Sequence, residues 1–250
     1  MKRLFFDIEV SPNIGLFWQS GYKLNIGHDS IIKERAIICI CYKWEGQKTV
    51  HSLKWDEKQN DKQILKQFIK IIDSADEVVG HNGDNFDIKW IRTRCIFHNI
   101  DMMPTYKTID TLKEARKGFK FNSNKLDYIG DFLGHGRKTN TSYDLWKNIL
   151  LKKDNKALTE MIKYCKRDVE LLESVFASMN KYIKPKSHIG DYFCECPECG
   201  SDNIRQHDRR ISAAGIVTMV KKCMGCGKYH NVPENKHYKS VEQMKKFKKK

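Results

Sequence analysis

The chain has 250 residues, of which 40% are hydrophobic and 31% charged, a composition typical of a folded globular protein. The longest strongly apolar run, residues 36–42, is too short to span a membrane, and acidic residues interrupt the N-terminal apolar stretch, so we expect an intracellular protein without a signal peptide. The net charge is +15, and residues 181–250 contribute 16 basic against 7 acidic side chains. This excess could serve solubility alone, but its concentration favours a polyanionic partner such as nucleic acid.

Residues 3–10 predict a buried strand that carries two carboxylates. Asp7 and Glu9 are two positions apart, so on a strand they point to the same face. Two like charges on an otherwise apolar strand repel each other and lose hydration, unless a cation lies between them. The strand is therefore either a metal-binding element or an edge strand with a solvated polar face.

Two further strands are predicted at 35–44 and 47–55, separated by a turn. With the first strand they are expected to form an antiparallel meander. Residues 58–73 then place apolar side chains at helical spacing and predict a helix.

A short strand at 78–80 runs into a polar, glycine-containing loop, and a helix is predicted at 86–98. This places Asp87 in the first turn of that helix. A carboxylate in a first turn commonly caps free N–H groups and complements the helix dipole. Taken by itself, Asp87 is therefore explained by capping as well as by metal binding.

The middle of the chain combines a short strand at 105–110 with helices at 111–117 and 124–133. Phe119 and Phe121 are interleaved with basic side chains there, a pattern that can bind a nucleic-acid strand through phosphates and base stacking. A solvated helix face with two core phenylalanines fits equally well. The basic residues are Lys113, Arg116, Lys117, Lys120 and Lys125.

The longest predicted helix covers 156–180 and ends a mixed α/β domain assigned to residues 1–183. Tyr164 and Asp168 are four residues apart and share one side of this helix, beside its apolar stripe. They could project into a cleft, or they could form a hydrogen-bonded pair on the helix surface.

A linker at 184–190 leads to a predicted zinc ribbon at 191–234, in which residues 211–220 can form the strands of a small hairpin. Two C-x-x-C-G turns can bring four thiolates onto one ion and close a tetrahedral zinc site with no open position for catalysis. Cys194 is either a free thiol or a competitor of the first ligand. The predicted zinc ligands are Cys196, Cys199, Cys223 and Cys226.

The remaining segment, 235–250, is predicted to be a basic tail, and residues 239–250, which end in a run of lysines, are predicted to form a flexible arm that either contacts nucleic acid or is disordered. His207 and His230 are not expected to bind zinc once four cysteines are available. The other cysteines lie in apolar segments and are expected to be small buried residues. They are Cys39, Cys41, Cys95 and Cys165.

Three short motifs, in order and at workable spacing, resemble those of the DEDD 3′→5′ exonucleases in their tyrosine form. They are Asp7-Ile8-Glu9, Asn82-x-x-x-Phe86-Asp87 and Tyr164-x-x-x-Asp168. The histidine form would have His at the position of Lys163. The sequence of residues 6–10 most resembles the proofreading domain of family B DNA polymerases. Residues 108–112 and 125–129 also resemble segments of that family.

The resemblance implies a ribonuclease H-like mixed sheet flanked by helices and two divalent ions, Mg²⁺ or Mn²⁺, which suit hard oxygen ligands. It implies that Asp7 bridges both ions. Glu9 and Asp168 are expected to hold the ion that activates water, and Asp87 the ion on the leaving-group side. Tyr164 is expected to orient the attacking water.

Five residues are predicted to serve the substrate. Asn82 is expected to steady the second motif or touch a 3′ end, while Phe86 packs beside it. Lys120 belongs to the basic and aromatic segment. Arg209 and Arg210 surround the predicted zinc ribbon, which could hold substrate or a protein partner.

The sequence therefore predicts a free-standing 3′→5′ exonuclease of a cell or a phage, acting on single-stranded ends, with DNA favoured over RNA. No polymerase fits in the residues that follow the predicted nuclease domain, although replication or repair partners are possible. A structure-specific endonuclease on the same fold is one alternative. A non-catalytic nucleic-acid-binding adaptor is the other, although four retained acids argue against it.

Overall fold

The computed structural model describes residues 2–19, 21, 25–137 and 142–247. The chain divides into two compact units, one from Lys2 to Val175 and one from Phe176 onward. Within the described residues, no helix is both long enough and apolar enough to cross a lipid bilayer.

The first unit is built on a five-stranded mixed sheet in the order β5-β4-β1-β6-β7. β1 pairs antiparallel with β4, and β4 with β5, which confirms the predicted meander. On its other edge, β1 pairs in parallel with β6, and β6 with β7. The strands are β1 (Arg3–Val10), β4 (Ile37–Trp44), β5 (His51–Lys54), β6 (Glu77–Gly80) and β7 (Thr108–Asp110).

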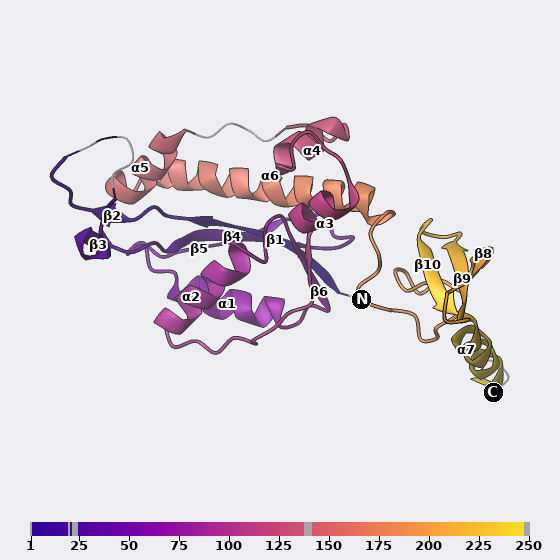
Figure 1. Ribbon diagram of the computed structural model, residues 1–250. Helices are drawn as coiled ribbons and strands as arrows, with labels where there is room; N and C mark the ends of the chain where they lie inside the picture. Colours follow the sequence, from indigo (N-terminus) through magenta and orange to yellow (C-terminus); the bar gives the residue numbers. More distant parts are fainter. Residues whose placement is uncertain (1, 20, 22–24, 138–141, 248–250) are drawn as a thin grey trace. The chain divides into compact units, whose positions relative to one another are not determined.

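Helices cover both faces of this sheet, with α1 and α2 on one face and α6 along the other (Figure 1). All predicted helices of this unit are present, and α5 is an additional one. Two short strands, β2 (Ile14–Gly15) and β3 (Ile31–Lys33), form a separate ladder near the 3₁₀ helix His28–Ser30. The helices are α1 (Lys62–Ile72), α2 (Asp87–Phe97), α3 (Thr111–Gly118), α4 (Leu126–Phe132), α5 (Tyr143–Lys152) and α6 (Asn155–Asn180).

Alternation along β1 separates the core from the polar side chains. Leu4, Phe6 and Ile8 join the buried apolar cluster that α1 and α2 complete. Because successive side chains of a strand point to opposite faces, Asp7 and Glu9 must lie on the face that α6 covers. The fold thus places both carboxylates on the face of β1 opposite Leu4, Phe6 and Ile8.

A buried ionic cluster around Asp61 fastens one edge of the core. Its carboxylate accepts hydrogen bonds from Ile37 N (2.9 Å), Arg94 Nε (2.8 Å) and His98 Nε2 (2.6 Å), and its side chain is 0% exposed. Burial opposes ionisation, but the Arg94 guanidinium and the Ile37 N–H together lower the pKa of Asp61. β4, α1 and α2 are therefore joined through one carboxylate.

The second unit contains a three-stranded antiparallel sheet in the order β10-β9-β8, followed by α7. The predicted hairpin is present, with strands that extend beyond both ends of the predicted segment. The elements are β8 (Ile204–Ile211), β9 (Val217–Cys223), β10 (Tyr229–Pro233) and α7 (Glu234–Phe247).

The prediction of a flexible arm is wrong for residues 239–247, which belong to α7. The many lysines of this segment indicated a solvated chain, but Ser240 is only 3% exposed and anchors the helix. Its hydroxyl accepts a hydrogen bond from Cys194 N (3.1 Å) and donates one to Cys194 Sγ (3.4 Å). Residues 248–250 of the predicted tail lie outside the described residues.

Candidate active site

Three of the four predicted carboxylates converge on one point. One oxygen each from Asp7, Glu9 and Asp168 lies within 4.8 Å of the other two. Asp7 and Glu9 come from β1, and Asp168 comes from α6, which covers the same face of the sheet (Figure 1). Asp168 is buried and the other two are half-buried. Three anionic groups at this spacing form a strongly negative site suited to a hard cation.

Asp87 lies beside this group rather than inside it. It is the first residue of α2, is 3% exposed, and its Oδ1 accepts a hydrogen bond from Ile8 N (3.1 Å). The parallel pairing of β1 with β6 ends at Phe5, so the Ile8 N–H is available on that edge. Burial and then the negative charge of Asp7 raise the pKa of Asp87. Asp87 is thus fixed to the backbone of β1 at Ile8, the residue between Asp7 and Glu9 in the sequence.

The loop that delivers Asp87 is held by Asp110, to which the sequence analysis gave no role. The carboxylate of Asp110 caps α3 through Leu112 N (3.0 Å), and it also accepts hydrogen bonds from Asn82 N (2.9 Å) and Asp84 N (3.3 Å). Asn82 adopts a positive φ of 66°, which Asn tolerates better than most residues. The position of Asp110 between a predicted strand and a predicted helix could have identified it as a helix cap from the sequence.

The remaining predicted residues of the motifs lie close to this loop or on α6. Asn82 steadies the second motif, because its carbonyl oxygen accepts a hydrogen bond from Phe86 N (2.9 Å). Phe86 was expected to pack, but its side chain is 38% exposed. Tyr164 is half-buried and lies one helical turn before Asp168.

A cavity of about 590 Å³ opens beside the second motif. Phe119 and Phe121 stack with ring centroids 5.3 Å apart, and Phe121 meets Phe132 edge-on at 5.4 Å. Phe119 and Phe121, which were predicted to be either core or substrate-binding residues, are half-buried. Lys120 between them is exposed. The cavity is lined by His81, Leu112, Arg116, Ser123, Asn124, Lys125, Leu126 and Asp127.

A second hollow, of about 460 Å³, follows α6 and is rich in positive charge. Two of its cations, Lys163 and Arg167, directly precede Tyr164 and Asp168 in the sequence. The hollow is lined by His135, Arg137, Lys163, Lys166, Arg167, Glu170, Leu171 and Ser174.

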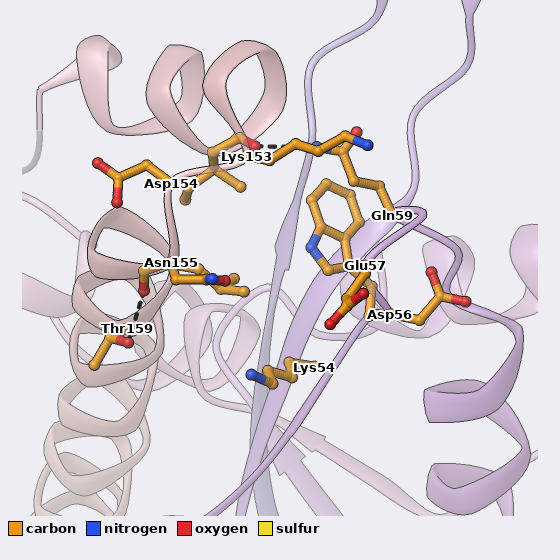
Figure 2. A pocket seen from close by; sticks show the side chains of 11 residues that line it. Lys54, Asp56, Glu57, Gln59, Lys153, Asp154, Asn155 and Thr159 are labelled. Atoms are coloured by element: carbon orange, nitrogen blue, oxygen red, sulfur yellow. Dashed lines mark hydrogen bonds between the residues drawn. The ribbon is translucent and has the colours of Figure 1, made fainter.

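A third cavity, of about 400 Å³, lies where the chain leaves β5 and where α5 meets α6 (Figure 2). Charges of both signs, including Lys54, Glu57 and Lys153, surround it, and Gln59 Nε2 donates a hydrogen bond to the carbonyl oxygen of Ile149 (3.0 Å). Of the described residues that line this cavity, none is a predicted site residue. It is therefore separate from the carboxylate site.

The four predicted zinc ligands meet in the second unit. Their Sγ atoms all lie within 4.8 Å of one another, with Cys196 to Cys226 and Cys199 to Cys223 both at 3.6 Å. Burial opposes ionisation of Cys223, but hydrogen bonds from backbone N–H groups and neighbouring thiols lower its pKa to about 7. Among the described residues, this group includes neither Cys194 nor a histidine.

Each cysteine turn closes on a glycine in the left-handed conformation. Gly200 has a φ of 70° and Gly227 a φ of 76°, values that residues with a β-carbon rarely adopt. Their N–H groups donate to the carbonyl oxygens of Cys196 (2.9 Å) and Cys223 (3.0 Å). These small turns and the three-stranded sheet fit a zinc ribbon.

The two predicted substrate-binding arginines of the ribbon are both ion-paired. Arg209 makes two hydrogen bonds to the Glu234 carboxylate, at 3.0 and 3.1 Å. Arg210 Nε lies 3.2 Å from Asp208 Oδ2. Both arginines are exposed, so these pairs contribute little to stability and leave the guanidinium groups accessible.

Comparison with known proteins places the first unit in a family. The profile of the RNase H superfamily matches residues 4–180. A family B DNA polymerase from the hyperthermophilic archaeon Pyrobaculum calidifontis shares the fold with a TM-score of 0.55 and 15% identity, over 72% of this chain and 24% of the polymerase chain. This chain thus spans about a quarter of that protein, and no curated protein matches its sequence significantly. From residue 4 to residue 180, the chain belongs to the RNase H superfamily.

Proposed function

We propose that this protein is a metal-dependent 3′→5′ exonuclease that hydrolyses phosphodiester bonds at single-stranded ends, with DNA as the preferred substrate. The observation that carries the proposal is the convergence of Asp7, Glu9 and Asp168, with Asp87 fixed beside them. RNase H superfamily membership supports nuclease chemistry, and the motif order supports the 3′→5′ direction.

The donor set fits hard divalent ions. Carboxylate oxygens from three residues within 4.8 Å of one another are ligands that Mg²⁺ and Mn²⁺ accept, while thiophilic metals prefer sulfur. Asp7, Glu9 and Asp168 would hold one ion, and Asp87 would share a second with Asp7. Two such ions, when bound, activate water and stabilise the leaving oxygen.

The protein's own residues orient the reacting groups. Asp110 fixes the loop that begins at Asn82, and this loop in turn fixes Asp87 at the start of α2. Tyr164 lies one turn before Asp168, where its hydroxyl would orient the attacking water and help remove its proton. Asn82 and the exposed Phe86 ring would contact the 3′-terminal nucleotide.

The charged surroundings supply a path for a single strand. The cavity beside His81 presents Arg116 and Lys125, and the nearby stacked phenylalanine rings offer a platform for bases. The hollow along α6 adds Arg137 and Lys163, which would bind phosphates. Both hollows are bordered by residues adjacent in sequence to the site motifs.

The second unit would bind one structural Zn²⁺ and retain substrate. Four thiolates complete a tetrahedral zinc site, so this ion would take no part in hydrolysis. The exposed Arg209 and Arg210 and the exposed strand β8 provide a basic surface for the nucleic-acid backbone.

The test is digestion of a single strand labelled at its 5′ end, as DNA and as RNA, with Mg²⁺, with Mn²⁺ and with EDTA. We expect a ladder that shortens from the 3′ end, depends on metal and is faster on DNA. Release of labelled mononucleotide from the start would indicate the opposite polarity. Discrete internal products would instead indicate an endonuclease.

Two variants make the result specific. Asp7→Asn should abolish the ladder, whereas Asp144→Asn, which changes an exposed carboxylate on α5, should retain it. If the wild-type protein binds both strands in a salt-sensitive manner but cleaves neither, the proposal fails and the adaptor function is favoured.

A further inference from the structure

Three buried thiols that the proposed nuclease mechanism does not use meet beside the carboxylate site. Cys39 and Cys41 belong to β4 and Cys165 belongs to α6, and each is 0% exposed. Their Sγ atoms all lie within 4.8 Å of one another, the same limit that the four ribbon cysteines satisfy. These residues were predicted to be small buried core residues, and the structure gathers them into one group.

Strand register explains why the thiols lie beside the carboxylates. Cys41 is the cross-strand partner of Asp7, and Cys39 is the partner of Glu9, so all four side chains share the face covered by α6. Cys165 lies one turn before Asp168 on that helix. The thiols therefore come from β4 and α6, and the three converging carboxylates come from the neighbouring strand β1 and from the same helix.

The two groups are in direct contact through Asp7. Cys165 Sγ lies 3.5 Å from the Asp7 carbonyl oxygen and 3.6 Å from Asp7 Oδ2. Cys41 Sγ lies 3.7 Å from the carbonyl oxygen of Ile162 on α6. Asp7 thus belongs to the carboxylate site and also borders the thiol group.

The spacing of the sulfur atoms suits a single soft ion. A zinc–sulfur bond is about 2.3 Å long, so three thiolates in one plane around an ion are roughly 4.0 Å apart. The observed separations, all within 4.8 Å, need little adjustment to reach this value. Thiolates select Zn²⁺ or Cu⁺ over Mg²⁺ and Mn²⁺, so the two adjacent sites would discriminate between classes of metal.

We propose that Cys39, Cys41 and Cys165 form a second sulfur site, which binds one thiophilic ion such as Zn²⁺ or Cu⁺ beside the carboxylates. Binding replaces three S–H bonds with metal–sulfur bonds and releases three protons, so it requires no oxidant or reductant. The bound ion would also attract Asp7 Oδ2, drawing that carboxylate away from the hard-metal site. Occupancy would therefore inhibit hydrolysis, a consequence that rests on the proposed nuclease function.

The test is a titration of the full chain with Cd²⁺, read as cadmium retained per chain and as thiolate-to-cadmium charge-transfer absorption. We expect two thiolate-bound ions in the wild-type protein, one in the ribbon and one in the new site. Cys41→Ala should bind one. The matched control Cys95→Ala, which alters a buried cysteine outside both groups, should bind two. Cys199→Ser should retain the second site while disturbing the ribbon.

A single thiolate-bound cadmium in the wild-type protein would overturn the proposal, whether or not every variant folds. Retention of two ions by a folded Cys41→Ala protein would do the same. In the functional arm, with excess Mg²⁺, cadmium should inhibit the wild-type and Cys95→Ala proteins at the second equivalent and leave Cys41→Ala active. If no protein cleaves nucleic acid, the nuclease proposal fails while the cadmium count still decides the thiol site.

Discussion

The carboxylate site and the ribbon cysteines gather their ligands in opposite ways. The ribbon takes four thiols from two short turns, and few buried apolar residues, among them Met219, Val220 and Val232, support its sheet. The carboxylates come from a strand and two helices that an extensive apolar core already holds. The comparison leads us to expect that the ribbon needs a bound ion for its structure, whereas the core of the first unit can support its fold without an ion in the carboxylate site.

The largest expected effect comes from removing zinc. A strong chelator should unfold β8, β9 and β10, because zinc binding to such a site supplies about 10–16 kcal/mol of folding free energy. Hydrogen exchange resolved by segment should show lost protection after residue 190 and unchanged protection in the five-stranded sheet. Equal loss of protection in both units would contradict the expectation that only the ribbon needs an ion for its fold.

Asp7→Asn should act on chemistry without harming the fold. We expect hydrolysis to slow about a thousandfold, because a lost metal ligand removes several kcal/mol of transition-state stabilisation. The melting temperature should stay the same or rise, since one of three converging negative charges is removed. A steep fall in melting temperature would mean that the carboxylate site, like the ribbon, is structural. Asp144→Asn is the matched control.

Asp61→Ala should destabilise the fold rather than affect the chemistry directly. We expect the free energy of unfolding of the first unit to fall by about 3 kcal/mol. Removing one partner of a buried ion pair leaves the other uncompensated, although Arg94 also lies over the Phe97 ring at 4.3 Å. Urea denaturation followed in the sheet unit measures this loss. Ribbon protection and zinc content should be unchanged, and exposed Asp144→Ala should have no effect.

The same carboxylate predicts acid sensitivity. The pKa of Asp61 is lowered from an ordinary value of 3.8, so the folded protein binds fewer protons at this residue than the unfolded chain does. Its contribution to stability is present above pH 3.8 and is lost as the pH falls through the lowered pKa. The difference in stability between the wild-type and Asp61→Ala proteins should therefore shrink in that range. A constant difference would contradict the assignment.

The smallest effects should come from the basic hollow along α6. Lys163→Ala and Arg137→Ala should each weaken binding of single-stranded DNA several-fold and lower the salt dependence by roughly one ion. Binding measured at several salt concentrations, in Ca²⁺ to suppress hydrolysis, checks this. Lys152→Ala at the end of α5 is the control. Unchanged slopes in both variants would exclude this hollow from the substrate path.

Most helices and strands of the first unit could be predicted from local sequence patterns. The alternation in residues 3–10 and the helical spacing in α1 and α6 were enough to identify these elements, because burial of one face imposes a period on the sequence. α5 was missed, and α7 was mistaken for a flexible tail because its high charge outweighed a single buried contact at Ser240. Such an anchor depends on a partner distant in sequence and leaves no local pattern.

The sequence by itself was enough to select candidate site residues, since Asp7 and Glu9 share a strand face and each C-x-x-C-G turn places two thiols together. Only the tertiary structure decided how these residues meet. It fixed Asp87 on the Ile8 N–H beside the other acids, supported the second motif through Asp110, and gathered Cys39, Cys41 and Cys165 beside the carboxylates. The physical reason is that strand register and helix packing set distances between distant segments, and no local periodicity encodes them.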